Sequence, residues 1–215
     1  TPGYAPVSIK GYAPGDYCMT IGYPGSTNRY LSSWGIVERT EATNQAVIDV
    51  RTTKQNVWKH WMDADRTIEL KYSSKWASSS NYWKNSIGMN KAIVDNKVLE
   101  TKAEQEAKFA KFAQEKGNAD YAKVVGQIDA IIEKSNPLLY RYTCYNEILR
   151  NGIEFTIPTN IMDQLKKAIQ SKNKEEIKAS AEKLRSAYKQ VHNKNYDHEV
   201  DRKVAKVLLP LYAEM

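Results

Sequence analysis

Three histidines are the first candidates for chemistry in this sequence, because a hydrolase of the Ser-His-Asp kind needs an imidazole held between a nucleophile and a carboxylate. They are His60, His192 and His198. His60 lies between two tryptophans in the amphipathic stretch VWKHWMD, which is typical of a histidine on a helix surface. His192 and His198 flank a helix junction in HNKNYDH, and their spacing does not match a helical zinc pair. We therefore expect neither a catalytic histidine nor a metal site here.

The candidate nucleophiles lead to the same expectation. The sequence contains no Gly-x-Ser-x-Gly motif and no phosphate-binding Gly-x-x-x-x-Gly-Lys motif. Ser26 follows the turn sequence Gly-Tyr-Pro-Gly, where a hydroxyl usually hydrogen-bonds to the backbone. Cys18 and Cys144 lie far apart and match no metal spacing, so we expect two buried thiols. The residue types by themselves identify no catalytic site and require no cofactor.

Helices dominate the predicted structure from Thr43 onward, because apolar residues recur there at helix-face intervals. A helix over 66–80 is expected to break in the serine run before Asn81, and one long helix is expected from 81 to Gly117. Pro137 and Asn151-Gly152 mark further breaks. Helices are expected over 120–134, 137–150 and from Pro158-Thr159 to Lys172, and two more span 174–192 and 196–213, the second strained by Pro210. The pattern predicts an antiparallel array of about six or seven helices.

The first part of the chain has a different pattern. Residues 1–37 are rich in Gly, Pro and Tyr, and the apolar run 16–23, DYCMTIGY, is bounded by Pro-Gly pairs, which predicts a strand between turns. A second strand is expected from Asn28, in NRYLSSWGIVE, and a short extended segment in IEFTIP, 153–158. The predicted fold class is therefore mainly α with a short N-terminal β segment.

Composition excludes several classes of protein. The chain begins with Thr1 instead of methionine, and we interpret it as an excised segment of a longer protein. No apolar stretch approaches the ~18 residues of a membrane span. The net charge of +7 is spread along the chain, with Lys and Glu at solvated helix positions, and no basic patch indicates a nucleic-acid partner. We expect no membrane insertion and no nucleic-acid binding.

Two stretches resemble the signatures of a known family. Residues 15–31, GDYCMTIGYPGSTNRYL, and residues 81–91, NYWKNSIGMNK, are similar to paired motifs of the bacterial serine dipeptidyl-peptidases typified by dipeptidyl-peptidases 7 and 11. The resemblance implies a chymotrypsin-like double β-barrel with an inserted helical domain, and an enzyme that removes dipeptides from the free N-terminus of peptides. Residues 1–42 would then be a β segment of the peptidase barrel, and residues 43–215 an incomplete helical cap.

The resemblance places the catalytic residues outside this chain. The family's catalytic histidine and aspartate precede the Gly-Tyr-Pro-Gly segment, and its serine follows the helices in a Gly-Asn-Ser-Gly-Ser motif, so none of the three is matched. Asp16, in Pro-Gly-Asp-Tyr, superficially resembles the setting of the catalytic aspartate, but it directly precedes the Gly-Tyr-Pro-Gly strand, and we interpret it as a turn residue. The isolated chain is expected to be inactive.

Asn81, at the head of NYWKN, is the one functional residue that the resemblance implies. It is similar to the family's asparagine that contacts the free amino group of the substrate. The chemistry fits, because an ammonium group has three donors and no acceptor, so an amide oxygen can accept one hydrogen bond. The alternative is an N-cap at the start of the predicted long helix. The neighbouring Tyr82 and Trp83 are expected to be packing residues.

The remaining expectations also follow from the resemblance. Peptides with a free N-terminus are the expected partners, no cofactor or metal is expected, and the full-length enzyme could form a homodimer. The periplasm or the cell surface is the expected location. The alternative is a helical binding or scaffold domain without a catalytic role, and the two readings differ in whether the parent gene encodes the missing histidine, aspartate and serine.

Overall fold

The computed structural model describes residues 3, 7–19, 25, 28–156 and 159–214, in two compact units, Thr1–Tyr30 and Leu31–Met215. In the first unit, the backbone N–H of Asp16 donates to the carbonyl of Ala13 at 3.1 Å. The Asp16 carboxylate accepts the N–H of Ala13 at 2.7 Å. Asp16 is therefore a turn residue, as predicted. Residues 16–19 of the predicted strand 16–23 are not in a strand, and 20–23 lie outside the described residues.

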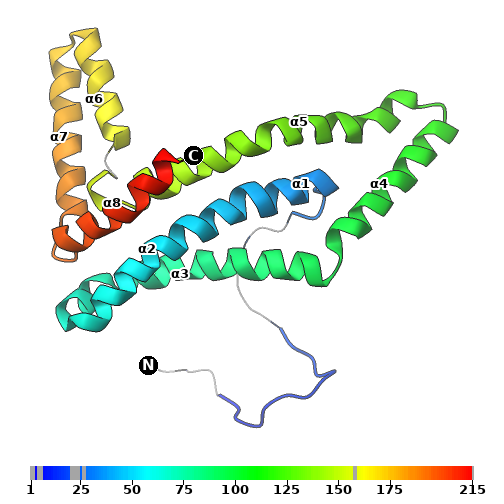
Figure 1. Ribbon diagram of the computed structural model, residues 1–215, viewed down its shortest axis with the longest axis horizontal. Coiled ribbons are helices and arrows are strands. Elements are labelled where there is room, and N and C mark those ends of the chain that lie inside the picture. Colours follow the sequence, from blue (N-terminus) through cyan, green and yellow to red (C-terminus); the bar gives the residue numbers. More distant parts are fainter. Residues whose placement is uncertain (1–2, 4–6, 20–24, 26–27, 157–158, 215) are drawn as a thin grey trace. The chain divides into compact units, whose positions relative to one another are not determined.

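Helices make up the second unit almost entirely (Figure 1). The α-helices are α1 Ser33–Val37, α2 Gln45–Ala64, α3 Arg66–Asp95, α4 Val98–Glu115, α5 Ala119–Tyr145, α6 Thr159–Ser171, α7 Lys174–Val191 and α8 His198–Ala213. Short helices of other types are η1 Glu38–Asn44, η2 Asn146–Arg150 and η3 Glu154–Thr156. No strand occurs in the described part of the chain. The mainly helical fold is confirmed, whereas the assignment of residues 1–42 to a barrel stays a prediction.

The helical region begins earlier than the sequence suggested, so the predicted strand from Asn28 is wrong where α1 forms. The Ser32 side chain caps α1 by accepting the N–H of Gly35 at 3.1 Å. Glu106, from the distant helix α4, accepts both the N–H and the hydroxyl of Ser33 at 2.6 Å. These contacts satisfy N–H groups that the first turn of a helix leaves free. A capping carboxylate so distant in sequence cannot be recognised from local pattern.

Helix α3 continues through the serine run, so the predicted break before Asn81 is wrong. Ser79 and Ser80 are buried, at 4% and 3% exposure. Helix α3 packs along α2 (Figure 1). The side-chain amide of Gln55, on α2, donates to the Ser79 hydroxyl at 3.1 Å. Serines that would weaken an isolated helix are held helical here by tertiary contacts.

Two further predicted boundaries are wrong. The helix expected from 81 to 117 is divided at Lys97, which is left-handed with φ 48°, while the Asn96 amide bonds back to the carbonyl of Ala92 at 2.8 Å. This is the usual end of a helix at an αL residue. Helix α5, by contrast, runs through Pro137. Its packing against α4, α1, η1 and α2 offsets the backbone hydrogen bond that proline cannot donate.

The later boundaries agree better with the predictions. Gly117 follows α4 and Asn173 caps α7, accepting the N–H groups of Glu175 and Glu176. Helices α6 and α7 pack against each other as a hairpin (Figure 1). Within the segment expected to be extended, Glu154–Thr156 instead forms a turn of 3-10 helix.

The hydrophobic core joins helices that are far apart in sequence. Its members are Ala46, Val50, Trp58, Ile68, Tyr72, Cys144, Ile148, Ile153, Val200, Val204 and Leu208. They come from α2, α3, the end of α5 with η2, the turn after η2, and α8. Cys144 is buried as predicted, but Cys18 is exposed, so that part of the prediction is wrong. Burial raises the pKa of the Cys144 thiol to about 11, which makes it an unreactive core residue.

Gly152 lies against this core directly after η2, and its lack of a side chain is required there. A Cβ at this position would lie 2.5 Å from the carbonyl oxygen of Glu147 and 2.6 Å from that of Ile148. These atoms belong to the backbone, so the turn itself would have to move. Gly126, on α5, has nothing within 4 Å of the same point.

We predict that Gly152→Ala lowers the free energy of unfolding by about 2–3 kcal/mol, because overpacking forces the backbone to shift. Gly126→Ala is the matched control and should raise stability by up to about 1 kcal/mol, since alanine favours a helix interior. Urea denaturation of both variants checks this. Equal effects of the two substitutions would contradict the packing explanation.

Candidate functional site

A cleft of about 420 Å³ opens between α2, α3 and the turn that follows η2. It is lined by Arg51, Lys54, Trp58, Lys75, Ser78, Ser79, Tyr82, Asn151 and Glu154. Aromatic rings and charged groups therefore share one surface, as is common in sites that bind small or extended ligands.

Arg51 anchors the α2 side of the cleft through a buried ion pair with Glu147. Its Nε lies 2.7 Å from one carboxylate oxygen and its second guanidinium nitrogen 2.9 Å from the other, a bidentate arrangement. The third nitrogen donates to the carbonyl of Ser79 at 3.2 Å. The side chains of Arg51 and Glu147 are only 13% and 9% exposed. The Arg51 guanidinium therefore links α2 to both η2 and α3.

Lys54 lies one turn further along α2 and is 2% exposed. Its Nζ donates to the carbonyl of Asn151 at 3.0 Å and lies 4.8 Å from the centre of the Trp58 ring. Burial lowers the pKa of Lys54 to about 8, and Glu147 offsets only part of this effect. Lys54 is therefore a buried amine whose pKa lies well below that of an ordinary surface lysine.

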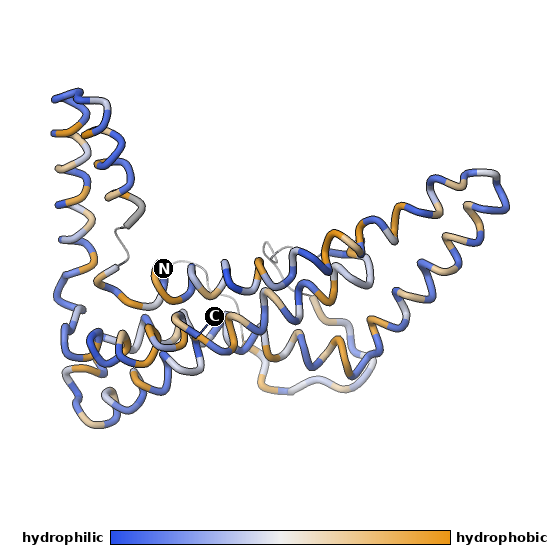
Figure 2. Tube along the Cα trace, turned by 45° about the horizontal axis from the view of Figure 1, so that its top comes forward, coloured by the Kyte–Doolittle hydropathy of each residue, from blue (hydrophilic) through white to orange (hydrophobic). Residues whose placement is uncertain are grey.

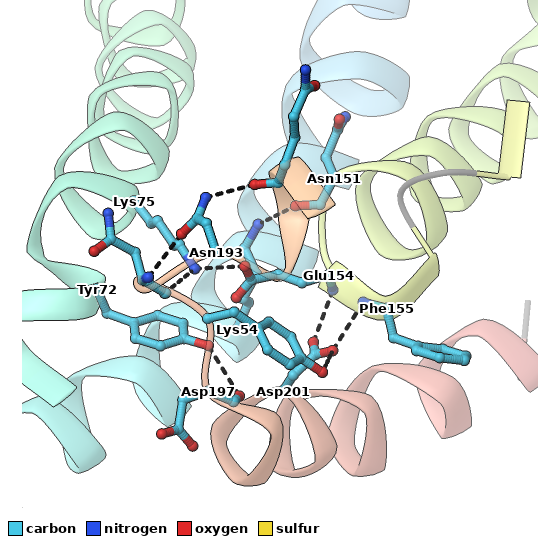
Figure 3. Close-up of polar contacts among 12 residues, drawn as sticks. Lys54, Tyr72, Lys75, Asn151, Glu154, Phe155, Asn193, Asp197 and Asp201 are labelled. Carbon is cyan, nitrogen blue, oxygen red and sulfur yellow. Dashed lines mark hydrogen bonds and ion pairs between the residues drawn. The ribbon is translucent and has the colours of Figure 1, made fainter. Parts of the chain in front are cut away.

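A second charged group closes the opposite side of the cleft (Figure 3). Lys75, on α3, lies 2.5 Å from Glu154 and donates to the carbonyl of Asn195 at 2.6 Å. The N–H groups of Glu154 and Phe155 both donate to the carboxylate of Asp201, on α8, at 2.8 and 2.9 Å. The turn carrying Glu154 is therefore fixed by α3 and α8 together.

Asn81 lies on α3 between cleft-lining Ser79 and Tyr82, although it does not itself line the cleft. Its side chain is exposed, and in the described part of the chain it has no hydrogen-bond partner. Because α3 begins at Arg66, the N-cap alternative for Asn81 is wrong. Asn81 is thus an accessible amide on a rigid helix segment that Arg51 and Gln55 hold in place.

The residues beside Asn81 divide between packing and the cleft. Trp83 is half-buried, and its indole N–H donates to the hydroxyl of Thr52 at 2.8 Å, in agreement with a packing role. Tyr82 is 64% exposed, lines the cleft and lies over Arg51, with the guanidinium carbon 5.1 Å from the ring centre. Most of the Tyr82 side chain is exposed, so the prediction that it is a packing residue is wrong.

The other candidates from the sequence do not gather into a site. His60 is exposed on α2, edge-on to Trp61. His192 stacks among aromatic rings, 4.3 Å from that of Tyr196, and His198 pairs with the neighbouring Glu199 at 3.2 Å. Across the residues that the structure describes, no group of three His, Cys, Asp or Glu side chains could hold a metal ion. Ser26 lies outside the described residues.

Sequence reasoning missed the charged lining of the cleft. One signal was present, because Lys54 follows Val50 and precedes Trp58 at four-residue intervals on the apolar stripe of α2. A lysine in the middle of an apolar helix face is almost never fully buried unless it has partners. Those partners, at Asn151 and Glu147, lie far away in sequence and could not be named from the pattern.

The arrangement is that of a helical domain presenting a polar cleft and an exposed amide, and comparison with known proteins identifies its family. The family model "Peptidase S46" matches residues 1–215. Dipeptidyl-peptidase 7 of Phocaeicola vulgatus is 60% identical over 97% of the chain and 29% of its own length. The Asp/Glu-specific dipeptidyl-peptidase of Porphyromonas gingivalis is 34% identical over 96% of the chain and 29% of its own length. The chain belongs to the peptidase S46 family.

Solved structures agree with this assignment. DPP11 of Porphyromonas endodontalis, in complex with the dipeptide Arg-Glu, superposes with a TM-score of 0.74 at 30% identity. The superposition covers 90% of this chain and 28% of that one. The chain thus spans less than a third of the length of the relatives it matches. Among the described helices, none is both long and apolar enough to cross a membrane.

We predict that Glu147→Gln lowers the free energy of unfolding by about 3 kcal/mol, because it leaves the buried Arg51 guanidinium without a counter-charge. Asp95→Asn is the matched control, since it breaks an exposed pair with Lys91 and should cost less than about 1 kcal/mol. Chemical denaturation at neutral pH compares the two. A small effect of Glu147→Gln would show that the pair does not hold the helices together.

We also predict a pH-dependent contribution from Lys54. Between the folded pKa of about 8 and the unfolded value of ~10.4, the unfolded chain binds one proton more, so this residue's contribution to stability rises with pH through that window. Below about pH 8 the full cost of burying the charge is present. Lys54→Met removes that cost, and its stability relative to wild type should fall by about 1–2 kcal/mol between pH 8 and pH 9.5.

Unfolding of wild type and Lys54→Met at several pH values checks the prediction. Lys59→Met, at an exposed position on the same helix, is the control and should differ from wild type by an amount that does not vary over this range. A constant difference for Lys54→Met would mean that its pKa is unperturbed.

Proposed function

We propose that this chain is the helical part of a serine exopeptidase that releases dipeptides from the free N-terminus of peptides. The observation that carries the proposal is the family match over the whole chain together with 60% identity to a dipeptidyl-peptidase. The DPP11 neighbours include complexes with the dipeptides Arg-Glu and Arg-Asp, which supports peptides as the class of ligand. The catalytic histidine, aspartate and serine would lie in the parent protein outside these residues.

Asn81 is proposed to accept a hydrogen bond from the ammonium group of the substrate. An exopeptidase must recognise a chain end, and an ammonium donor needs a neutral or negative acceptor. Asn81 supports this role because its amide is solvent-exposed and unpartnered within the described residues, on a segment of α3 whose backbone is fixed by Arg51. A carboxylate elsewhere in the parent enzyme would balance the charge.

The helical part would act as a cover over the peptidase cleft, excluding water and admitting only a chain end. The contacts of Arg51 and Lys75 fix α3 to α2 and to the turn that carries Glu154, which supports such a role. We also propose the periplasm or the cell surface as the location, on the family resemblance alone. The competing proposal, a binding or scaffold domain, would share the fold without turnover in the parent protein.

We predict that Asn81→Ala in the full-length protein lowers kcat/KM for dipeptidyl reporter substrates by about 10- to 100-fold, the effect of losing a hydrogen bond to a charged group. The 215-residue chain itself should show no turnover in the same assay. Asn85→Ala, one helical turn away and also exposed, is the matched control and should retain most of the activity.

A substrate analogue without the amino group separates recognition of the chain end from general damage. Wild-type enzyme should prefer the amino-bearing substrate strongly, and Asn81→Ala should lose most of that preference. An undiminished preference would remove Asn81 from the amine site while leaving the peptidase proposal intact. Turnover by the purified 215-residue chain would instead overturn the assignment of the catalytic residues to other parts of the parent.

A further inference from the structure

The cleft between α2, α3 and the turn after η2 carries polar groups that the ion pairs of its walls do not use. Hydrophobic and hydrophilic positions recur in turn along the helices, as Figure 2 shows, so rings and charged groups can share one surface. Two aromatic rings and three positively charged side chains line the cleft. Within the described part of the chain, Glu154 is the one negatively charged residue in this lining. The lining therefore has an excess of positive charge.

Two of the three positive groups already have partners. The Arg51 guanidinium donates from all three of its nitrogens, to the Glu147 carboxylate and to a backbone carbonyl. Lys75 is paired with Glu154 at 2.5 Å. Each of these ion pairs balances its own charge. The positive charge that remains for a ligand is therefore that of Lys54.

Lys54 also has an incomplete set of hydrogen bonds. Its ammonium has three N–H donors, and among the described residues the carbonyl of Asn151, at 3.0 Å, is its one hydrogen-bond acceptor. The Trp58 ring lies 4.8 Å from the same nitrogen. One N–H direction is left, on an amine that burial has already separated from water. A negative group entering the cleft gains more from such an amine than from a surface lysine, because the local dielectric is low.

The Glu154 carboxylate lacks a donor. One of its oxygens pairs with Lys75, whereas Oε1 is buried and has no hydrogen-bond partner in the part of the chain that the structure describes. The Tyr72 hydroxyl does not satisfy it, because that hydroxyl donates to the carbonyl of Asp197 at 3.3 Å. A buried acceptor without a donor is unfavourable. The last torsion of a glutamate is soft, so a small rotation turns this oxygen toward a ligand N–H in the cleft.

These two unsatisfied groups define the chemistry of the ligand. Lys54 requires a carboxylate, and Glu154, whose charge is already balanced, requires only a neutral N–H. The last residue of a peptide presents these two groups side by side, as its terminal carboxylate and its own amide N–H. The cleft volume of about 420 Å³ is sufficient for such a chain end. A phosphate group, with more than one negative charge and no N–H, matches the lining less well.

We propose that this cleft binds the free C-terminus of a peptide that ends in an apolar residue. The terminal carboxylate accepts a hydrogen bond from Lys54, and the N–H of the last residue donates to Glu154. The last side chain packs against the rings of Trp58 and Tyr82. Recognition of a chain end by fixed polar groups is a recurring mode of peptide binding. The proposal concerns binding alone and holds whether or not the parent protein is a peptidase.

Calorimetric titration of the 215-residue chain with N-acetyl-leucyl-leucine and with its C-terminal amide tests the proposal. The two probes differ only in the terminal group, and acetylation removes the amino group, so the proposed role of Asn81 does not enter. We expect the acid to bind at least about 10-fold more tightly, because the amide cannot form the charge-assisted bond. Unacetylated leucyl-leucine should bind about as tightly as the acetylated acid.

Three results of this titration would overturn the proposal. They are no binding of the acid, equal affinities for the acid and the amide, and binding that requires a free amino group. The third result would indicate that the chain recognises the N-terminal end of the probe instead. Failure of the peptidase proposal would leave all of these affinities as expected, so the two proposals are tested separately.

A lysine variant identifies the group that binds the carboxylate. Lys54→Met should weaken binding of the acid by about 10- to 100-fold and abolish the preference for the acid over the amide. Lys59→Met, at an exposed position on the same helix, is the matched control and should leave both affinities unchanged. Melting curves verify that both variants fold. An undiminished preference for the acid in Lys54→Met would contradict the proposal.

A tyrosine variant tests the aromatic wall without changing any charge. Tyr82→Ala should weaken the acid and the amide alike by about 5-fold, because it removes apolar contact area and leaves Lys54 in place. Tyr82 is 64% exposed, so the variant should fold. Tyr121→Ala, 61% exposed on α5 and outside the cleft lining, is the matched control and should bind as wild type does. Equal effects of the two substitutions would place the peptide elsewhere and overturn the proposal.

Discussion

The buried ion pair between Arg51 and Glu147 is the interaction on which the arrangement of this domain depends. A guanidinium removed from water is tolerated only when its donors are satisfied, and here a bidentate carboxylate and the Ser79 carbonyl satisfy them. Those acceptors belong to η2 and α3, far from α2 in sequence. The requirement to pair one buried charge therefore fixes three segments relative to one another, with greater directional specificity than apolar packing alone provides.

The geometry of the candidate site depends on the Arg51–Glu147 ion pair. The turn of α3 that bears Asn81 packs on α2 through buried serines, and Lys75 attaches the same helix to the turn of Glu154. Asn81 needs no partner of its own, because the helix beneath it is already fixed. This arrangement suits the chain-end recognition proposed above, since a bond to a mobile ammonium gains most when the acceptor is held in place beforehand.

Helix α5 illustrates a different use of apolar surface. One of its faces packs against other helices, and large apolar side chains on another face stay exposed within the part of the chain that the structure describes. Pro137 lies inside the helix without ending it, so both faces continue past the proline.

The sequence by itself determined the helical class, the stops at Gly117 and Asn173, the turn at Asp16 and, through two long motifs, the peptidase family. These features depend on local periodicity, on capping residues and on sequence motifs, all of which can be recognised without a structure. Only the tertiary structure decided that α1 is helical, that α3 passes through its serine run and that Lys54 faces a cleft. In each case the deciding contact comes from a residue distant in sequence. Glu106 caps α1, the Arg51 guanidinium donates to the Ser79 carbonyl, and the Lys54 amine donates to the Asn151 carbonyl. Local propensity is worth a fraction of a kcal/mol per residue, and a buried hydrogen bond to a charged group outweighs it.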